Sequence, residues 1–155
     1  MFKTILWATD GSETAAKALR HALGLAEPDN AKLVVAHVRE IFVGRAGGHP
    51  VLADEAELRD RIHEQVEDLQ HAGREATFIV RTSSSGQAAR TIAKIADDVE
   101  ADVIVVGTHG YGRVTSLVLG SVTQGLLHEG TCPVFAVPTG TPVEAREHAF
   151  AGGIA

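Results

Sequence analysis

The chain has 155 residues, 45% of them hydrophobic and 22% charged, and a formal net charge of -6. This composition is typical of one soluble globular domain, and the negative charge argues against a general nucleic-acid binder, which needs a basic face to neutralise phosphates. The single cysteine, Cys132, excludes an intrachain disulfide, and no apolar run reaches the ~18 residues of a membrane span. No signal-peptide pattern opens the chain, so we expect a cytoplasmic protein with no membrane or nucleic-acid partner.

The first part of the chain predicts a strand, a helix and a second strand. Residues 4–9 form an apolar, β-rich run, and the Asp-Gly-Ser turn after it allows Ser12 to N-cap a helix. Apolar residues then recur at helical spacing from Ala15 to Ala26, and a Pro-Asp-Asn sequence ends the helix. A second buried strand is predicted over 32–38.

A second helix and a third strand follow a loop that contains three glycines. The helix is marked by four apolar residues at helical spacing, which are Leu58, Ile62, Val66 and Leu69. Gly73 can close it, and residues 76–80 predict the third strand. A polar turn from Ser83 to Gly86 then leads to a third helix. The inward residues of that helix are Ala89, Ile92, Ala96 and Val99.

The last part of the chain repeats the same alternation. The fourth strand, over 102–106, is the most apolar, and a glycine-rich loop follows it. A short helix is predicted over roughly 121–129 and a fifth strand over 133–137. Residues 139–155 show no periodic pattern, so we expect a mobile tail after a domain that spans 1–138.

Strands separated by helices predict an α/β fold with right-handed crossovers and a parallel sheet. The strands are continuous apolar runs, as expected when helices cover both faces of the sheet. In such a sheet ligands bind beyond the carboxyl ends of the strands, where the strand order reverses. Two turns can lie there, the one at 9–12 and the one after Val106.

The glycine-rich segment after Val106 has the chemistry of a phosphate site. Its glycines let the backbone approach a ligand, and consecutive free N–H groups make a concave anion site. Gly120-Ser121 opens a helix whose first N–H groups have no internal partner, and Arg113 is a cation that could close over phosphates. Glycines that serve only the turn itself explain the same residues, so both interpretations stay open at this point.

Other motifs in the chain do not indicate a function. There is no P-loop, and the pattern Gly-x-Gly-x-x-Gly that begins at Gly110 fails at Thr115, which excludes a standard dinucleotide site. The eight histidines are scattered without metal-ligand spacing, so we expect them in loops or at the surface. The acidic run at 54–57 is expected to be a solvated helix face, and Cys132 a small apolar residue.

The spacing of the loop nevertheless matches a known signature. In that signature a glycine is followed after two residues by a second glycine, and after nine more residues by Gly-Ser. Gly107, Gly110, Gly120 and Ser121 have this spacing. Together with the turn at 10–12, the His37-Val38 pair and the segment 132–137, these residues resemble the ATP-binding signature of the universal stress protein family. The resemblance implies a Rossmann-like sandwich of the adenine nucleotide alpha hydrolase type, with a five-stranded parallel sheet of order 3-2-1-4-5 and helices on both faces.

The resemblance also implies a role for each matched residue. Val38 would meet adenine through its backbone, Ala8 and Thr9 would line the base and ribose, and Asp10 would face ribose hydroxyls or a hydrated metal. For Asp10 the alternative is a cap on the first helix. The residues that would wrap ribose and phosphates are Gly107, Thr108, His109, Gly110, Gly112 and Arg113. Those that would hold the phosphate tail are Gly120, Ser121, Val122 and Thr123.

We therefore expect a stress-response regulatory protein that binds an adenine nucleotide, ATP first of all, as a switch ligand. Whether Mg²⁺ bridges the phosphates stays open, and no catalytic residue or protein metal site is predicted. The alternatives are a slow ATPase or nucleotide-transferring enzyme on the same fold, or a binder of AMP or cyclic AMP. The missing P-loop lysine and the lack of an identifiable general base argue against an efficient enzyme.

The fifth strand also predicts an assembly. Residues 133–137 are apolar and uncharged, and in the implied order they form an edge of the sheet. Two copies related by a two-fold axis could each cover the edge strand of the other. The family's dimers, which pair through this strand, imply the same homodimer. The alternative is a monomer in which the tail at 139–155 covers the edge.

Overall fold

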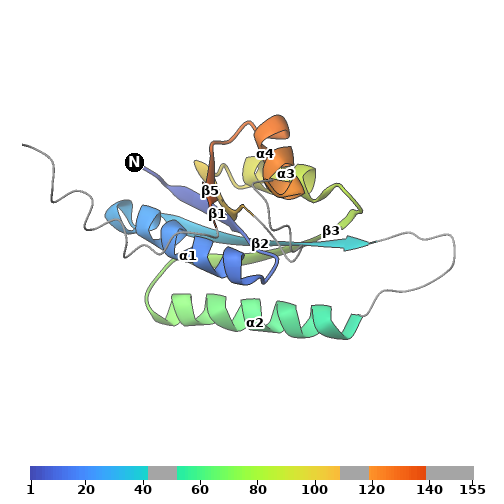
Figure 1. Cartoon of the computed structure of the whole chain (residues 1–155). Helices are drawn as coiled ribbons and strands as arrows, with labels where there is room; N and C mark the ends of the chain where they lie inside the picture. The colour runs from blue at the N-terminus through green and yellow to red at the C-terminus, as the bar shows by residue number, and fades with distance from the viewer. Residues whose placement is uncertain (42–51, 109–118, 139–155) are drawn as a thin grey trace, which may run out of the picture.

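The apolar runs of the sequence form the strands of a parallel sheet (Figure 1). Its order is β3-β2-β1-β4-β5, which confirms the fold that the family resemblance implies. In chain order the strands are β1 (Thr4–Ala8), β2 (Lys32–Ile41), β3 (Ala76–Ser84), β4 (Val103–Gly107) and β5 (Val134–Val137). The structure is a computed structural model that describes residues 1–41, 52–108 and 119–138.

Helices cover both faces of this sheet. They are α1 (Glu13–Ala26), α2 (Leu52–His71), α3 (Ala88–Asp98) and α4 (Ser121–Glu129), with a short 3-10 turn, η1 (Glu27–Asp29), after α1. In Figure 1, α1 and α2 lie on one side of the sheet and α3 and α4 on the other. Within the described part of the chain, no helix has the length and apolar character needed to cross a membrane.

Alternate side chains of the central strands point into two separate cores. Trp7 and Val35 belong to the core under α1 and α2, whereas Leu6 and Ile104 belong to the core under α3 and α4. Both faces of β1 and β4 are therefore covered, which explains why these strands are continuously apolar. The indole Nε1–H of Trp7 donates to the Ala15 carbonyl at 3.0 Å, so its one polar group is satisfied inside the core.

The helix ends follow the signals in the sequence. The Ser12 hydroxyl accepts the Ala15 N–H at 3.2 Å, and Glu13 lies in the first turn of α1, at the positive end of the helix dipole. After α2, Gly73 has a φ of 80°, the left-handed conformation that ends many helices. Both predicted signals are confirmed.

Strands β2 and β3 are longer than the sequence predicts. The predicted ends lie at Val38 and Val80, but the two strands pair in register as far as Ile41 and Ser84. The serines predicted as a turn are therefore partly strand, and the left-handed conformation is adopted by Gly86, with a φ of 77°. The added residues are mostly polar and are half-buried or exposed, so no hydrophobic pattern in the sequence shows that the strands continue through them.

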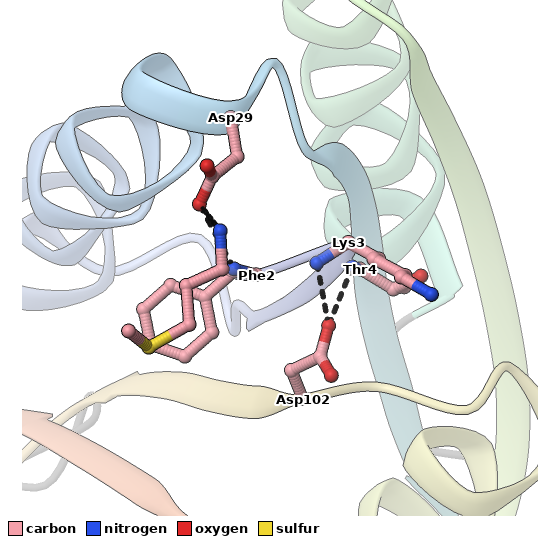
Figure 2. Close-up of polar contacts among 6 residues, drawn as sticks. Phe2, Lys3, Thr4, Asp29 and Asp102 are labelled. Atoms are coloured by element: carbon pink, nitrogen blue, oxygen red, sulfur yellow. Dashed lines mark hydrogen bonds and ion pairs between the residues drawn. The ribbon is translucent and has the colours of Figure 1, made fainter.

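Two carboxylates anchor the N-terminal residues of the chain (Figure 2). Asp29 accepts hydrogen bonds from the terminal amino group and from the Phe2 N–H. Asp102, which precedes β4, accepts the N–H of Thr4 at 2.9 Å and that of Lys3 at 2.6 Å. The hydrogen bond from Thr4, and then that from Lys3, lower the pKa of the Asp102 carboxyl. The start of β1 is thereby tied to the start of β4.

We predict that Asp102→Ala lowers the free energy of unfolding by about 1 kcal/mol at neutral pH, less than the ~1.5–3 kcal/mol typical of hydrogen bonds to a charged group, because solvent screens this carboxylate. Because the pKa is lowered in the folded chain, this contribution is complete above the ordinary value of about 3.9 and is lost as the pH falls through the folded value. Denaturant unfolding at neutral pH and near pH 3 measures both. Asp60→Ala, at an exposed position of α2, is the control, and equal effects of the two variants would contradict the prediction.

Candidate functional site

The sheet grows in opposite directions from β1 and β4. From β1 the chain adds β2 and then β3 on one side, while β4 lies on the other side with β5 beyond it. Ligands of open parallel sheets bind in the crevice beyond the carboxyl ends of such a strand pair. The segments that leave β1 and β4 therefore define the candidate site, as the sequence predicts.

The turn after β1 is ordered by its own side chains. Asp10 Oδ1 accepts the Ser12 N–H at 2.9 Å, and Thr9 Oγ1 accepts the Gly11 N–H at 3.1 Å. Gly11 has a φ of 79°, and a Cβ at this position would overlap the side chain of Leu58 in α2. Glycine is thus required here for conformation and for space. The side chain that caps α1 is that of Ser12, so the half-buried Asp10 does not serve as the cap.

Strand β2 continues past the end of β1. The last register pair is Ala8 with Ala36, after which the Thr9 N–H donates to the Ala36 carbonyl at 2.9 Å. Along a strand in a parallel sheet, consecutive residues direct their N–H and C=O groups to opposite sides, so residues i and i+2 face the same neighbour. Because Ala36 faces β1, the main chain of Val38 faces the same side, beyond the residue at which β1 ends.

A buried histidine, His37, holds this corner together. Its side chain Nδ1 lies 2.9 Å from the Thr9 carbonyl oxygen, and its Nε2 lies 2.8 Å from Oε1 of Glu55 in the first turns of α2. The residue is only 3% exposed. The sequence predicts surface histidines and a solvated acidic face at 54–57, and both predictions are wrong for this pair. The missed signal is a polar residue within an apolar strand, where burial demands hydrogen-bond partners.

Hydrogen bonds tie the end of β4 to its neighbours. The Thr108 N–H donates to the Val137 carbonyl at 2.9 Å, and the Thr108 carbonyl accepts the Gly120 N–H at 2.7 Å. The Thr123 hydroxyl, on a residue 1% exposed, donates to the Gly107 carbonyl at 3.1 Å. That hydroxyl proton therefore serves the fold, and the donor that Thr123 presents at the helix start is its main-chain N–H.

The start of α4 leaves main-chain N–H groups without a helical acceptor. Gly120 is the N-cap, with φ -58° and ψ 150°, and the helical hydrogen bonds begin with the Gln124 N–H, which donates to the Gly120 carbonyl at 2.9 Å. The N–H groups of Ser121, Val122 and Thr123 therefore lie in the helix turn that has no internal acceptor, at the positive end of the dipole. The exposed Ser121 adds a hydroxyl. Such an arrangement binds phosphate.

Most of the predicted site residues are brought to one edge of the sheet. Those at the carboxyl ends of β1, β2 and β4 or in the first turn of α4 are Ala8, Thr9, Asp10, Val38, Gly107, Thr108, Gly120, Ser121, Val122 and Thr123. Four others, His109, Gly110, Gly112 and Arg113, lie outside the described residues, as does the tail at 139–155. The part that each residue plays in binding stays a prediction.

The remaining chemical candidates do not add a reactive centre. Cys132, before β5, donates its thiol to the Ala101 carbonyl at 3.1 Å. Burial raises the pKa of this thiol, and the nearby carboxylates of Asp102 and Asp97 raise it further, so it is a poor nucleophile. Across residues 1–41, 52–108 and 119–138, no three His, Cys, Asp or Glu side chains gather as a metal site would require.

The sequence profile of the Universal stress protein family matches residues 1–138. The chain belongs to this family. A universal stress protein of Thermus aquaticus, from the 3' region of the QAH/OAS sulfhydrylase gene, is 35% identical over 140 residues, which cover 88% of this chain and 99% of the relative. Universal stress protein MJ0577 of Methanocaldococcus jannaschii is 30% identical over 157 residues and is covered to 95%.

Solved structures of universal stress proteins share the fold. The structure of MJ0577 superposes with a TM-score of 0.68 and 27% identity, and the match covers 92% of this chain and 99% of that one. A universal stress protein crystallised in complex with cAMP superposes with a TM-score of 0.59 and 26% identity, covering 90% of this chain and 99% of that one. The family resemblance of the sequence is thus confirmed along the whole domain.

One glycine of the family signature has a packing role that can be tested without any ligand. A Cβ on Gly107 would lie 2.7 Å from Thr14 Cγ2 and 3.1 Å from the Thr14 main-chain carbon. We predict that Gly107→Ala destabilises the fold by about 2 kcal/mol, or roughly 4–8 °C in Tm, because α1 must move away from β4. Thermal unfolding measures the loss.

The double variant Gly107→Ala, Thr14→Ser is the matched test of this mechanism. It removes Cγ2, the closest of the clashing atoms, but leaves the main-chain contact, so it should recover part of the loss. An unchanged Tm for Gly107→Ala would show that α1 and β4 can move apart at no cost. The packing role of Gly107 would then be refuted, and only its predicted role in ligand binding would remain.

Proposed function

We propose that this universal stress protein binds an adenine nucleotide, with ATP as the preferred ligand, at the carboxyl edge between β1 and β4. The bound nucleotide would act as a regulatory ligand in a stress response and not as the substrate of an efficient enzyme. The proposal depends above all on two main-chain surfaces at one edge, the open side of β2 at Val38 and the start of α4. The family member in complex with cAMP supports this class of ligand.

Adenine is the base that suits the main chain of Val38. Because the N–H and C=O of one residue in a parallel strand point to the same side, Val38 can donate to the purine N1 and accept from the 6-amino group. The half-buried Val38 lies beside Ala8 and Thr9, which are 4% and 6% exposed. A flat base placed there would be shielded from water on the side of the sheet.

A phosphate chain suits the start of α4. Three N–H groups lie there in the helix turn without internal acceptors, and the Ser121 hydroxyl is exposed beside them. The net charge of -6 does not oppose this, because local dipoles outweigh distant charges at contact distance. The hydrogen bond from Gly120 to Thr108 holds the helix start against the end of β4.

Asp10 is placed between these two surfaces in the turn after β1. Its Oδ1 accepts the Ser12 N–H, which orients the carboxylate and leaves Oδ2 for a ribose hydroxyl or a water of Mg²⁺. A bound Mg²⁺ would supply positive charge to the phosphates. The carboxylate would hold that ion through water, since one aspartate alone does not make a protein metal site.

Slow ATP hydrolysis is the alternative use of the same site. Hydrolysis needs a group that activates the attacking water. Among the described residues, the carboxylates of Asp10 and Glu55 and the ring of His37 lie near this edge, and each already hydrogen-bonds to the protein itself. This favours a ligand role for the nucleotide, and steady-state phosphate release separates the two functions.

The binding proposal is tested at Gly120, whose Cα would lie against phosphate. We predict that Gly120→Val abolishes ATP binding in calorimetry, because the side chain would push the ligand off the helix start. The backbone at Gly120, with φ -58° and ψ 150°, is accessible to valine, so the variant should fold. Asp10→Ala should weaken binding less, by about tenfold to a hundredfold.

Gly24→Val is the matched control for this experiment. Gly24 lies in α1, and a Cβ there would meet no atom within 4 Å, so its affinity should equal that of the wild type. Titration with ATP, ADP, AMP and cyclic AMP ranks the ligands in the same series. Unchanged ATP affinity in folded Gly120→Val would refute the phosphate assignment.

We also propose that the chain forms a homodimer through β5. This strand is an edge of the sheet, and its Phe135 is 40% exposed while its ring packs at 5.7 Å from that of His21 in α1. An apolar, uncharged edge strand readily pairs with another strand. Antiparallel pairing of two copies about a two-fold axis would cover both edges at once.

Light scattering at micromolar concentration should give the mass of a dimer, and Phe135→Glu should give a monomer because the carboxylates would meet across the axis. Leu127→Glu is the control, since Leu127 is also apolar and 58% exposed but lies on α4. A monomeric wild type would reject the dimer. A chain ending at Pro138 would then show whether residues 139–155 cover the edge.

A further inference from the structure

The ladder between β1 and β2 stops one hydrogen bond earlier than its geometry allows. The Thr9 N–H donates to the Ala36 carbonyl, and the next bond of a parallel ladder would run from the Val38 N–H to the Thr9 carbonyl. Within the described residues that bond is not formed. The Thr9 carbonyl accepts instead from Nδ1 of the His37 imidazole at 2.9 Å.

We propose that His37 is a positioning residue of the adenine site, one that occupies the Thr9 carbonyl and so keeps the main chain of Val38 open for the base. The inference rests on the proposed function for its ligand. His37 does not touch the nucleotide in this scheme. It acts through Val38, the next residue in the chain, whose N–H and C=O would otherwise be drawn into the sheet.

The partners of the ring determine how it is held. A carbonyl oxygen only accepts, so Nδ1 carries a proton, and on the other side of the ring Nε2 lies 2.8 Å from Oε1 of Glu55. Glu55 reaches it from α2 with its side chain 25% exposed, while the register partner of His37 on β3 is the apolar Val80. The carboxylate of Glu55 thus fixes the ring with Nδ1–H aimed at Thr9.

Keeping Val38 open gives the site a preference among purines. The N–H and C=O of Val38 match the N1 acceptor and the 6-amino donor of adenine. A 6-oxopurine such as that of inosine triphosphate presents a donor at N1 and an acceptor at position 6, which opposes both groups. The ratio of the two dissociation constants therefore reports the state of Val38, whereas the affinity for inorganic tripolyphosphate reports only the phosphate half of the site.

Three variants separate positioning from packing. His37→Leu fills the space but gives no donor to Thr9, and we expect its preference for ATP over inosine triphosphate to fall by about tenfold while tripolyphosphate binding is unchanged. His37→Asn restores a donor close to the place of Nδ1 and should recover most of the preference. Glu55→Ala releases the ring and should give an intermediate loss, and Glu57→Ala, at an exposed position of the same helix, is the control.

Amide hydrogen exchange of the nucleotide-free protein gives a second readout. The Val38 amide should exchange rapidly in the wild type and slowly in His37→Leu, where its N–H can bond to the Thr9 carbonyl. If His37→Leu does not fold, the exchange rate of the Val38 amide is compared between Glu55→Ala and His37→Asn instead.

The two proposals fail in different ways. A wild-type protein that binds none of the adenine nucleotides refutes the proposed function. Amide hydrogen exchange at Val38 then still decides whether His37 keeps the main chain of Val38 out of the sheet. A folded His37→Leu with an unchanged base preference and an unprotected Val38 amide overturns the positioning role of His37.

Discussion

The pairing of β1 with β2 is the constraint on which the candidate site depends. The register runs from Thr4 with Lys32 to Ala8 with Ala36, and β2 then continues on β3 alone as far as Ile41. Among the residues that the structure describes, one side of β2 therefore has no strand neighbour at the point where the sheet reverses its order. Unpaired strand edges invite association, and this short one lies at the switch point, where open parallel sheets bind their ligands.

The glycines at this edge are explained by different features of the structure. Gly107 and Gly11 are required by packing, against Thr14 of α1 and Leu58 of α2. Gly120 has an extended backbone that any residue can adopt, so its conformation alone does not require glycine. Packing therefore accounts for Gly11 and Gly107 but conformation does not account for Gly120, and only the structure separates these cases.

The polar side chains that order the edge are mostly engaged with the protein itself. The hydroxyl of Thr123 bonds to Gly107, the ring of His37 to Thr9, and the carboxylate of Asp10 to Ser12. What remains for a ligand is largely main chain, which can be presented only by a rigid edge. Rigidity is supplied from the opposite end as well, where Asp102 ties the start of β1 to that of β4 (Figure 2).

The local sequence was sufficient for the kind and order of the elements and for the edge of the sheet at which the candidate site lies. Continuous apolar runs predict buried parallel strands, Ser12 and Gly73 mark helix ends, and the spacing from Gly107 to Ser121 identifies the loop and helix start of the family. These features depend on neighbours along the chain, whose conformational preferences are local. The contact of His37 with Glu55 and the length of β2 depend instead on how α2 and β3 pack. A buried polar group needs a partner, but only the packed elements decide which residue provides it, so the open main chain of Val38 is a property of the tertiary structure.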